Sequence, residues 1–208
     1  MSILTFTVDQ LIKSEAGTAL GEALLFRSAS NHKERARAIR KLVDYCCNEF
    51  ERNKHLKKQK ETSEDQLTVE IVSQMSLLGI DAAHDKQQGG HCDILVSGRE
   101  GFIWIAEAKK HSDYAWLDKG FKQLSTRYST GVDGQDTGDI IIYCWAKSSA
   151  EVLEKWRCEL RDRHKDVCVD KAVCQTSLTF NSAHEHVATS RQFQTRHKIV
   201  SLHFEPEA

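Results

Sequence analysis

The sequence predicts a mixed α/β fold, in which one β-sheet is flanked by helices. Three observations support this class. Apolar residues recur with a helical period over 31–78, three short apolar strands follow between residues 80 and 108, and another helix and an apolar strand come after these. Such an order is typical of a layered α/β domain. It favours a core of one helix, three strands, one helix and one strand, with an N-terminal helical extension and extra C-terminal strands.

Length and composition are those of an ordinary globular domain. The chain has 208 residues, of which 40% are hydrophobic and 28% are charged, and its formal net charge is −1. This length suits one domain with an appendage, so we place residues 1–62 as a helical extension packed on a core formed by residues 63–208. Because the net charge is near zero, any affinity for nucleic acid must come from local patches.

The sequence predicts a cytoplasmic protein with reduced thiols. Residues 1–5 lack the basic and apolar regions of a signal peptide. No apolar run approaches the roughly 20 residues that span a bilayer. The seven cysteines are odd in number and include no C-x-x-C pair. Free cysteines of this kind usually fill space in the core.

Residues 31–60 have the pattern of a long basic helix. Asn31 is a favourable N-cap, and an apolar stripe at helical spacing follows it. The stretch holds ten Lys or Arg residues against four Asp or Glu, which leaves a surplus of six positive charges. Such a surplus could hold phosphates, and a solvated helix face explains it equally well. Residues 1–30 are mildly apolar and fit one or two short helices or strands.

A second helix is predicted from Ser63 to Leu78. Ser63 and Gln66 have the spacing of a capping box, and Gly79 suits the turn that ends the helix. After this glycine the apolar period becomes that of strands. The three strands that we expect here cover residues 80–86, 92–96 and 102–108.

The remaining elements complete the sheet. We expect a helix over 113–128, then a strand over 139–145 whose run of isoleucines indicates burial on both faces. Ser148 or Ser149 caps a further helix that ends near residue 164. Beyond it the apolar residues alternate as they do in β structure, over 167–180 and 198–204.

Two acidic residues and a lysine stand out against these apolar strands. Glu107 and Lys109 are two positions apart at the end of one strand, so their side chains point to the same face. Asp93 opens the preceding strand, which we expect to be the neighbour in the sheet. Charged groups placed in this way are costly unless they are paired or bind something. Two carboxylates could hold Mg²⁺, and the lysine could orient an attacking water.

This arrangement resembles the PD-(D/E)XK superfamily, the restriction-endonuclease-like nucleases. The resemblance lies in two motifs. The first is the Gly-Gly-His-Cys-Asp-Ile-Leu-Val stretch at residues 89–96, and the second is the Glu-Ala-Lys tripeptide at 107–109, whose glutamate follows Asp93 by fourteen residues. The likeness covers about residues 64–145 and implies a mixed sheet with an αβββαβ core. Cys92 stands where the family usually has a proline.

The resemblance implies a site for Mg²⁺, for which Mn²⁺ would substitute. Asp93 and Glu107 would bind the metal together with the backbone carbonyl of Ala108. Lys109 would be the catalytic lysine. These roles are carried over from the family's motif onto the matching positions of this chain.

Two further positions are expected from the resemblance. The family commonly adds a glutamate from the first core helix, for which we expect Glu70, with Glu64 as the alternative. Gln123, in the helix after the lysine, would join the catalytic residues by contacting substrate or metal-bound water. In some branches a tyrosine follows the glutamine by four positions, whereas Tyr128 follows here by five.

The function implied by the resemblance is hydrolysis of DNA phosphodiester bonds by an endonuclease. The basic helix over 31–60 would contact the phosphate backbone, and no base-reading motif is present, so low sequence specificity is expected. The resemblance to defence nucleases of this family implies prokaryotic anti-phage defence and a regulatory or sensor protein as partner, without a membrane. A homodimer is also expected, because two sites related by a two-fold axis cut both strands of a duplex most easily. Two alternatives stay open: a catalytically inactive nucleic-acid-binding or assembly subunit on the same fold, and a nuclease that acts on RNA.

Overall fold

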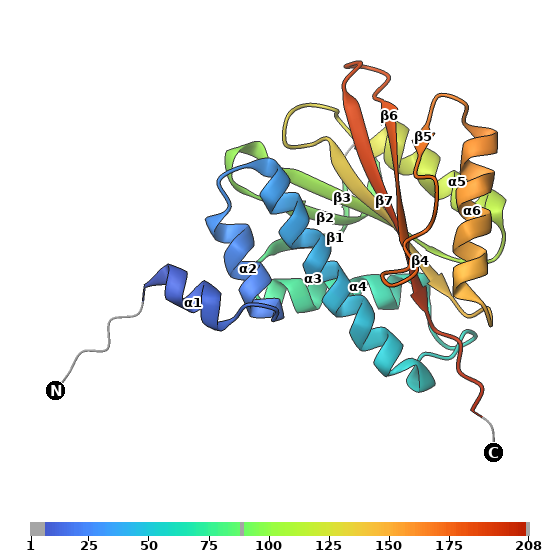
Figure 1. The fold of residues 1–208 in the computed structure, drawn as a ribbon, viewed down its shortest axis with the longest axis horizontal. Helices are drawn as coiled ribbons and strands as arrows, with labels where there is room; N and C mark the ends of the chain where they lie inside the picture. The colour runs from blue at the N-terminus through green and yellow to red at the C-terminus, as the bar shows by residue number, and fades with distance from the viewer. Residues whose placement is uncertain (1–6, 88–89, 207–208) are drawn as a thin grey trace.

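A single mixed sheet organises the computed structural model, which describes residues 7–87 and 90–206 (Figure 1). The sheet has seven strands in the order β1-β2-β3-β4-β7-β6-β5. β3 pairs parallel with β4, and β4 parallel with β7, whereas the other pairs are antiparallel. The strands are β1 (Asp81–Gln87), β2 (His91–Ser97), β3 (Ile103–Lys110), β4 (Thr137–Cys144), β5 (Cys168–Val169), β6 (Thr179–Glu185) and β7 (Gln192–Ser201).

Within the described residues there are six α-helices, and helices cover both faces of the sheet, so the predicted mixed α/β class is confirmed. The helices are α1 (Val8–Ser14), α2 (Ala19–Ser28), α3 (His32–Arg52), α4 (Glu64–Leu77), α5 (Tyr114–Gln123) and α6 (Ser149–Arg163), with short 3₁₀ turns at Lys54–Leu56 and Arg99–Gly101. One apolar core joins α2, α3 and α4 to one face, and a second joins α5 and α6 to the other. Figure 1 shows α3 and α6 on opposite sides of the strands. Within the described residues, no helix is both long enough and apolar enough for a membrane crossing.

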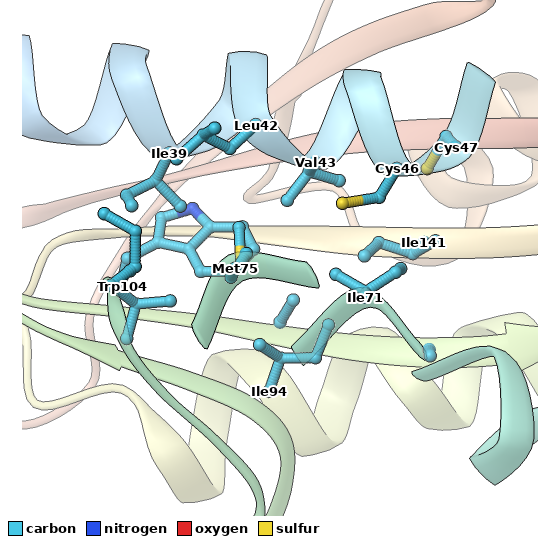
Figure 2. Close-up of a cluster of buried hydrophobic side chains, with 14 of the residues drawn as sticks. Ile39, Leu42, Val43, Cys46, Cys47, Ile71, Met75, Ile94, Trp104 and Ile141 are labelled. Carbon is cyan, nitrogen blue, oxygen red and sulfur yellow. The ribbon is translucent and has the colours of Figure 1, made fainter. Parts of the chain in front are cut away.

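The first core lies between α3, α4 and the sheet. Ile39 and Val43 of α3 pack towards Trp104 and Ile141, and all four side chains are fully buried (Figure 2). Full burial of such a side chain stabilises the fold by about 1.5–3 kcal/mol. The α3 stripe is therefore the main contact that holds the N-terminal part of the chain on the sheet.

The two predicted helix starts are confirmed. The Asn31 side chain accepts a hydrogen bond from the Glu34 amide, and the Ser63 and Gln66 side chains form the expected capping box. Gly79 ends the second helix with φ 73°, a backbone conformation that glycine adopts without strain. The first helix ends at residue 52 rather than near 60, because the apolar stripe stops there.

Three predicted boundaries differ from the structure. The helix expected over 113–128 ends as α5 at Gln123 and continues as a π-helical turn over Leu124–Tyr128. The β structure expected over 167–180 is mostly loop between the short β5 and β6. β7 begins at Gln192, earlier than predicted, because Phe193 is followed on its buried side by Thr195 and His197 rather than by further large apolar residues. The expectations for Gly89 and for residues 1–5 fall outside the described residues.

The cysteines are free, as predicted. All seven are unpaired, and four of them are buried: Cys46, Cys47, Cys92 and Cys144. Burial raises the pKa of the Cys47 thiol well above its ordinary value, so this side chain stays protonated and acts as an apolar filler.

Candidate active site

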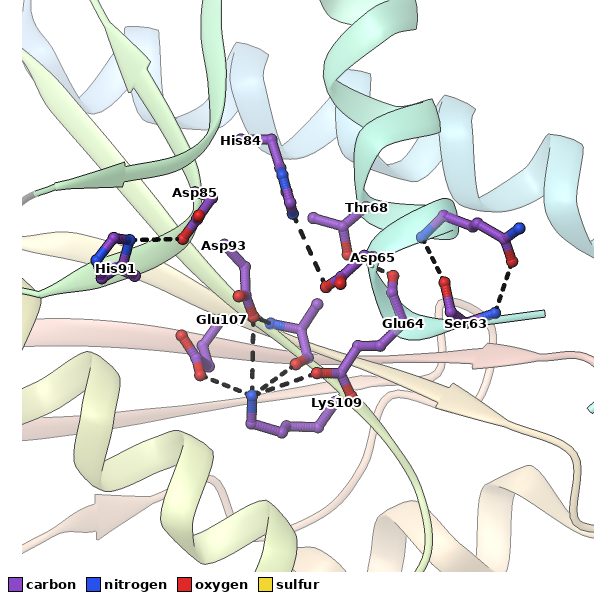
Figure 3. A network of polar contacts seen from close by, with 12 residues as sticks. Ser63, Glu64, Asp65, Thr68, His84, Asp85, His91, Asp93, Glu107 and Lys109 are labelled. Carbon is purple, nitrogen blue, oxygen red and sulfur yellow. Dashed lines mark hydrogen bonds and ion pairs between the residues drawn. The ribbon is translucent and has the colours of Figure 1, made fainter.

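The ends of β2 and β3 bring three of the expected residues together. The Lys109 ammonium lies 2.7 Å from Glu107 Oε1 and 3.8 Å from Asp93 Oδ2. It also donates a hydrogen bond to the carbonyl oxygen of Ala108 at 2.9 Å. Figure 3 shows the carboxylates of Asp93 and Glu107 directed at this one nitrogen. Both carboxylates thus lie on the same side of the sheet edge, within reach of one cation.

Asp93 is held at this edge by the neighbouring strand. The pairing of β2 with β3 runs from Ser97–Ile103 to Ile94–Ala106. Beyond that last pair, the amide of Ala108 donates to Asp93 Oδ2 at 2.7 Å. The Asp93 side chain therefore accepts the hydrogen bond of a β3 amide that the backbone of β2 no longer pairs with.

Glu64, and not Glu70, completes the cluster. Glu64 begins α4, and its Oε1 lies 3.5 Å from the Lys109 ammonium, while its Oε2 accepts from the Lys110 amide at 2.6 Å. Glu70 lies six residues farther, which is about 9 Å along the helix and about 120° around it. There its carboxylate pairs with Lys57. The capping box at Ser63 predicted that Glu64 opens the helix, but it does not show which of the two glutamates faces Lys109.

The cluster carries more negative than positive charge. Glu107 is only 1% exposed, and burial, followed by the nearby Asp93 charge, raises its pKa to about 7. Burial also raises the pKa values of Asp93 and Glu64. Burial opposes the charge of Lys109, but the three surrounding carboxylates outweigh it and raise the lysine pKa. The lysine therefore stays charged, and ionisation of all three acids leaves two negative charges without a partner.

We expect the metal-free protein to lose stability between about pH 4.5 and pH 7. The folded pKa of Glu107 is raised to about 7, so the folded state binds more protons than the unfolded chain in this window. The stabilisation by that proton is complete below pH 4.5 and is lost as the pH rises through 7. Thermal midpoints in EDTA should fall over this range for the wild type and less for Glu107→Gln. Parallel pH profiles for the two proteins would contradict the raised pKa.

Helix α5 covers the cluster with two residues that sequence reasoning did not select. A Cβ added at Gly120 would lie 2.9 Å from Lys109 Cγ and 3.5 Å from Glu107 Cγ. One turn earlier, the ring of Trp116 lies 5.4 Å from the Lys109 ammonium. Trp116 is half-buried. In the sequence, Trp116 and Gly120 are four positions apart on the helix that follows the lysine motif. This spacing places them on one helix face and could have indicated that they lie together over the cluster.

Replacing Gly120 by alanine should reduce any activity of this site more than it reduces stability. The added methyl group would push the flexible Lys109 stem and shift its ammonium. A displacement near 1 Å at a catalytic group can cost on the order of 100-fold in rate. Turnover and the thermal midpoint should be measured together, with Ala16→Ser, an exposed position between α1 and α2, as control. Unchanged turnover in Gly120→Ala would show that the lysine position does not matter.

Gln123 lies on the outer side of α5. It lines a shallow groove of about 380 Å³ together with Asp118, Lys119 and Arg127. The described residues that line this groove do not include Glu107 or Lys109. Gln123 therefore lies on the groove side of α5 and does not line the cluster with Glu107 and Lys109.

The helical part of the basic stretch 31–60, α3, does not surround the cluster, whereas Gln59 near the end of the stretch accepts a hydrogen bond from Lys110 at 2.8 Å. Lys33, Arg37 and Lys41 of α3 line a cleft of about 1020 Å³ on the sheet face opposite α5. Glu107 and Lys109 contact α5. The expected grip of this helix on a substrate at the cluster is therefore not supported by the arrangement of the two faces.

The donor atoms of the cluster suit a hard divalent cation. Across the described part of the chain, no three His, Cys, Asp or Glu side chains form a ready metal site. In the cluster, Asp93, Glu107 and Glu64 are arranged around the Lys109 ammonium instead of around a metal ion. Among the described residues, Glu107 Oε2 is buried and has no hydrogen-bond partner. Carboxylate and carbonyl oxygens are the ligands that Mg²⁺ prefers, and an unsatisfied buried oxygen is a coordination position that a cation would fill.

Comparisons with protein families, with curated proteins and with solved structures find no match to this chain. Its function must therefore be inferred from its own residues and their chemistry.

Proposed function

We propose that this chain is a divalent-metal-dependent nuclease that hydrolyses DNA phosphodiester bonds at Asp93, Glu107 and Lys109. The observation that carries this proposal is the convergence of two carboxylates and a backbone carbonyl on one buried ammonium. A phosphodiester is anionic, so its hydrolysis needs positive charge at the phosphate and an oriented water. The cluster provides cation ligands and a fixed positive charge next to each other.

The order of elements around the cluster supports the proposal. The sequence α4-β1-β2-β3-α5-β4 follows the αβββαβ order of the restriction-endonuclease-like core. Its four strands are neighbours in the sheet in the order β1-β2-β3-β4, with the last pair parallel. β3 carries Glu107 and Lys109 at its carboxyl end, where α4 and α5 meet its edge.

Asp93, Glu107 and the carbonyl of Ala108 are the groups that would hold Mg²⁺ or Mn²⁺, and Glu64 is placed to assist them. A bound divalent ion neutralises charge on the phosphate and lowers the pKa of coordinated water. Glu107 must lose its proton to bind the ion, so binding should release protons below about pH 7.

Lys109 orients the reacting groups in this proposal. Its side chain is 6% exposed, and its raised pKa keeps it protonated at neutral pH. A protonated lysine acts as a donor to the attacking water or to a phosphate oxygen, not as the general base. Burial under Trp116 and Gly120 restricts its position, which favours a defined geometry.

Plasmid degradation tests the proposal. Supercoiled DNA is incubated with the full chain in Mg²⁺, in Mn²⁺ and in EDTA, and with Lys109→Ala in the same conditions. Cleavage that needs metal and is lost in the variant supports the nuclease. Binding of DNA without cleavage under every metal would favour a catalytically inactive binding subunit. Labelled RNA in a parallel reaction decides which nucleic acid is cut.

A further inference from the structure

A half-buried aromatic ring lies beside the proposed active site. The Trp116 ring centroid lies 5.4 Å from the Lys109 ammonium and 4.7 Å from the ammonium of Lys119. Lys109 belongs to the buried cluster, whereas Lys119 is exposed on α5. The ring thus lies between the reacting centre and a positively charged surface, and a strand that reaches the cluster along α5 would pass it.

The outer face of α5 continues this surface. Lys119 lines the groove that also contains Lys122 and Arg127. Lys122 pairs with Asp118, which His164 also contacts, so the acidic charge in the groove is already compensated. Lys119 and Arg127 remain as cations at its rim, since neither has an ion-pair partner within the described part of the chain. Spaced cations of this kind fit successive phosphates of a nucleic-acid backbone.

The reacting groups are recessed below this surface. Glu107 and Lys109 are 1% and 4% exposed, and the side chains of Asp93 and Glu64 are each 24% exposed. A duplex is broad and stiff, and its bases stack on one another, so it offers no base face to a tryptophan. An unpaired strand is narrower and can place a base on an aromatic ring beside the scissile phosphate.

We propose that Trp116 is a base-stacking platform and that the site acts on nucleic acid with unpaired bases, whose backbone follows Lys119 and Arg127 along α5. This inference rests on the proposed nuclease function for the identity of the reaction. It assigns the substrate class and the path of the strand, which the cluster alone does not define.

Binding is measured in EDTA, which prevents metal-dependent cleavage, so the result does not depend on catalysis. The probe is a fluorescein-labelled DNA oligonucleotide of unstructured sequence, used alone or annealed to its complement. Wild type should bind the single strand more tightly than the duplex. Trp116→Leu should weaken single-strand binding about 5- to 150-fold, the usual range for one stacked base. Trp116→Phe, which keeps an aromatic face, should lose less and also guards against misfolding of the leucine variant.

The cations are tested through the salt dependence of binding. Lys119→Gln and Arg127→Gln should each reduce the slope of log Kd against log salt by about 0.7, the value for one phosphate contact on a single strand. Lys33→Gln is the matched control, because this exposed lysine lies on α3 across the sheet and should leave the slope unchanged.

The outcomes separate this inference from the nuclease proposal. Equal affinity for single strand and duplex, or unchanged binding in Trp116→Leu, overturns the stacking platform even if the wild type cuts plasmid. A loss of slope in Lys33→Gln as large as in Lys119→Gln overturns the path along α5. Strand binding that depends on Trp116, without cleavage in any metal, supports the platform and overturns the nuclease.

Discussion

Replacing Lys109 by methionine is expected to slow cleavage by about 100- to 10,000-fold and, at the same time, to tighten the binding of Mn²⁺. The Lys109 ammonium is held among three carboxylates, at 2.7 Å from Glu107, 3.5 Å from Glu64 and 3.8 Å from Asp93. It therefore competes with a divalent ion for the same oxygens. Methionine has a similar length and no charge, so the variant leaves these carboxylates free to bind the ion.

The loss of cleavage follows from the role of the lysine at the reacting water. Positioned proton donors and acceptors contribute about 100- to 10,000-fold to enzymatic rates, and the variant should lose a factor in this range. Titration calorimetry with Mn²⁺ and single-turnover cleavage measure the two effects on the same protein. Lys86→Met, an exposed lysine on β1, is the control and should change neither. Weaker Mn²⁺ binding in Lys109→Met would show that the lysine supports the metal ligands instead of competing with them.

Replacing Asp139 by asparagine is expected to give the largest loss of stability of any conservative change outside the site. Asp139 is fully buried on β4, and its two oxygens accept from Arg40 Nε at 2.9 Å and from Arg196 Nε at 2.6 Å. Arg196 also donates to Asp44 of α3, so this network joins α3 to β4 and β7. With asparagine at this position, Arg40 and Arg196 would have only the carboxylate of Asp44 left in the network.

Breaking a buried ion pair from one side costs about 3–5 kcal/mol. For a chain of this size, about 2–4 °C of thermal midpoint is lost per kcal/mol. The expected fall is therefore on the order of 6–20 °C, measured by circular dichroism. Asp133→Asn is the matched control, because that carboxylate is 74% exposed and lies 3.7 Å from His32. It should shift the midpoint by about 2 °C or less. A similarly small shift in Asp139→Asn would mean that the network does not hold α3 on the sheet.

The parts of this structure that the sequence predicted well depend on local signals. The Ser63 capping box and the glycine at position 79 fixed both ends of α4, because hydrogen bonds and φ angles there are decided within a few residues. The spacing of two between Glu107 and Lys109 placed both side chains on one face of β3, where Gly120 contacts both. The apolar run of β4 indicated its central position in the sheet.

The parts that could not be predicted depend on how elements pack. Glu64 and Glu70 lie on one helix, and only the angle between α4 and β3 decides which of them reaches Lys109. The basic charges of α3 were read from composition, but the sheet separates them from the cluster. β6 and the first half of β7 have a weak apolar alternation, since Phe180 and Phe193 are followed on the buried side by Ser182, His184 and Thr195 rather than by large apolar side chains.

The location of one bound ion tests the central claim most directly. Crystals grown or soaked with Mn²⁺ give an anomalous signal that places the ion independently of the protein density. We expect one peak bound by Asp93, Glu107 and the carbonyl of Ala108, with the Lys109 ammonium moved away from Glu107 relative to its present 2.7 Å contact. Crystals at saturating Mn²⁺ with no peak there, and with the Lys109–Glu107 contact unchanged, would contradict the metal site and the nuclease inferred from it.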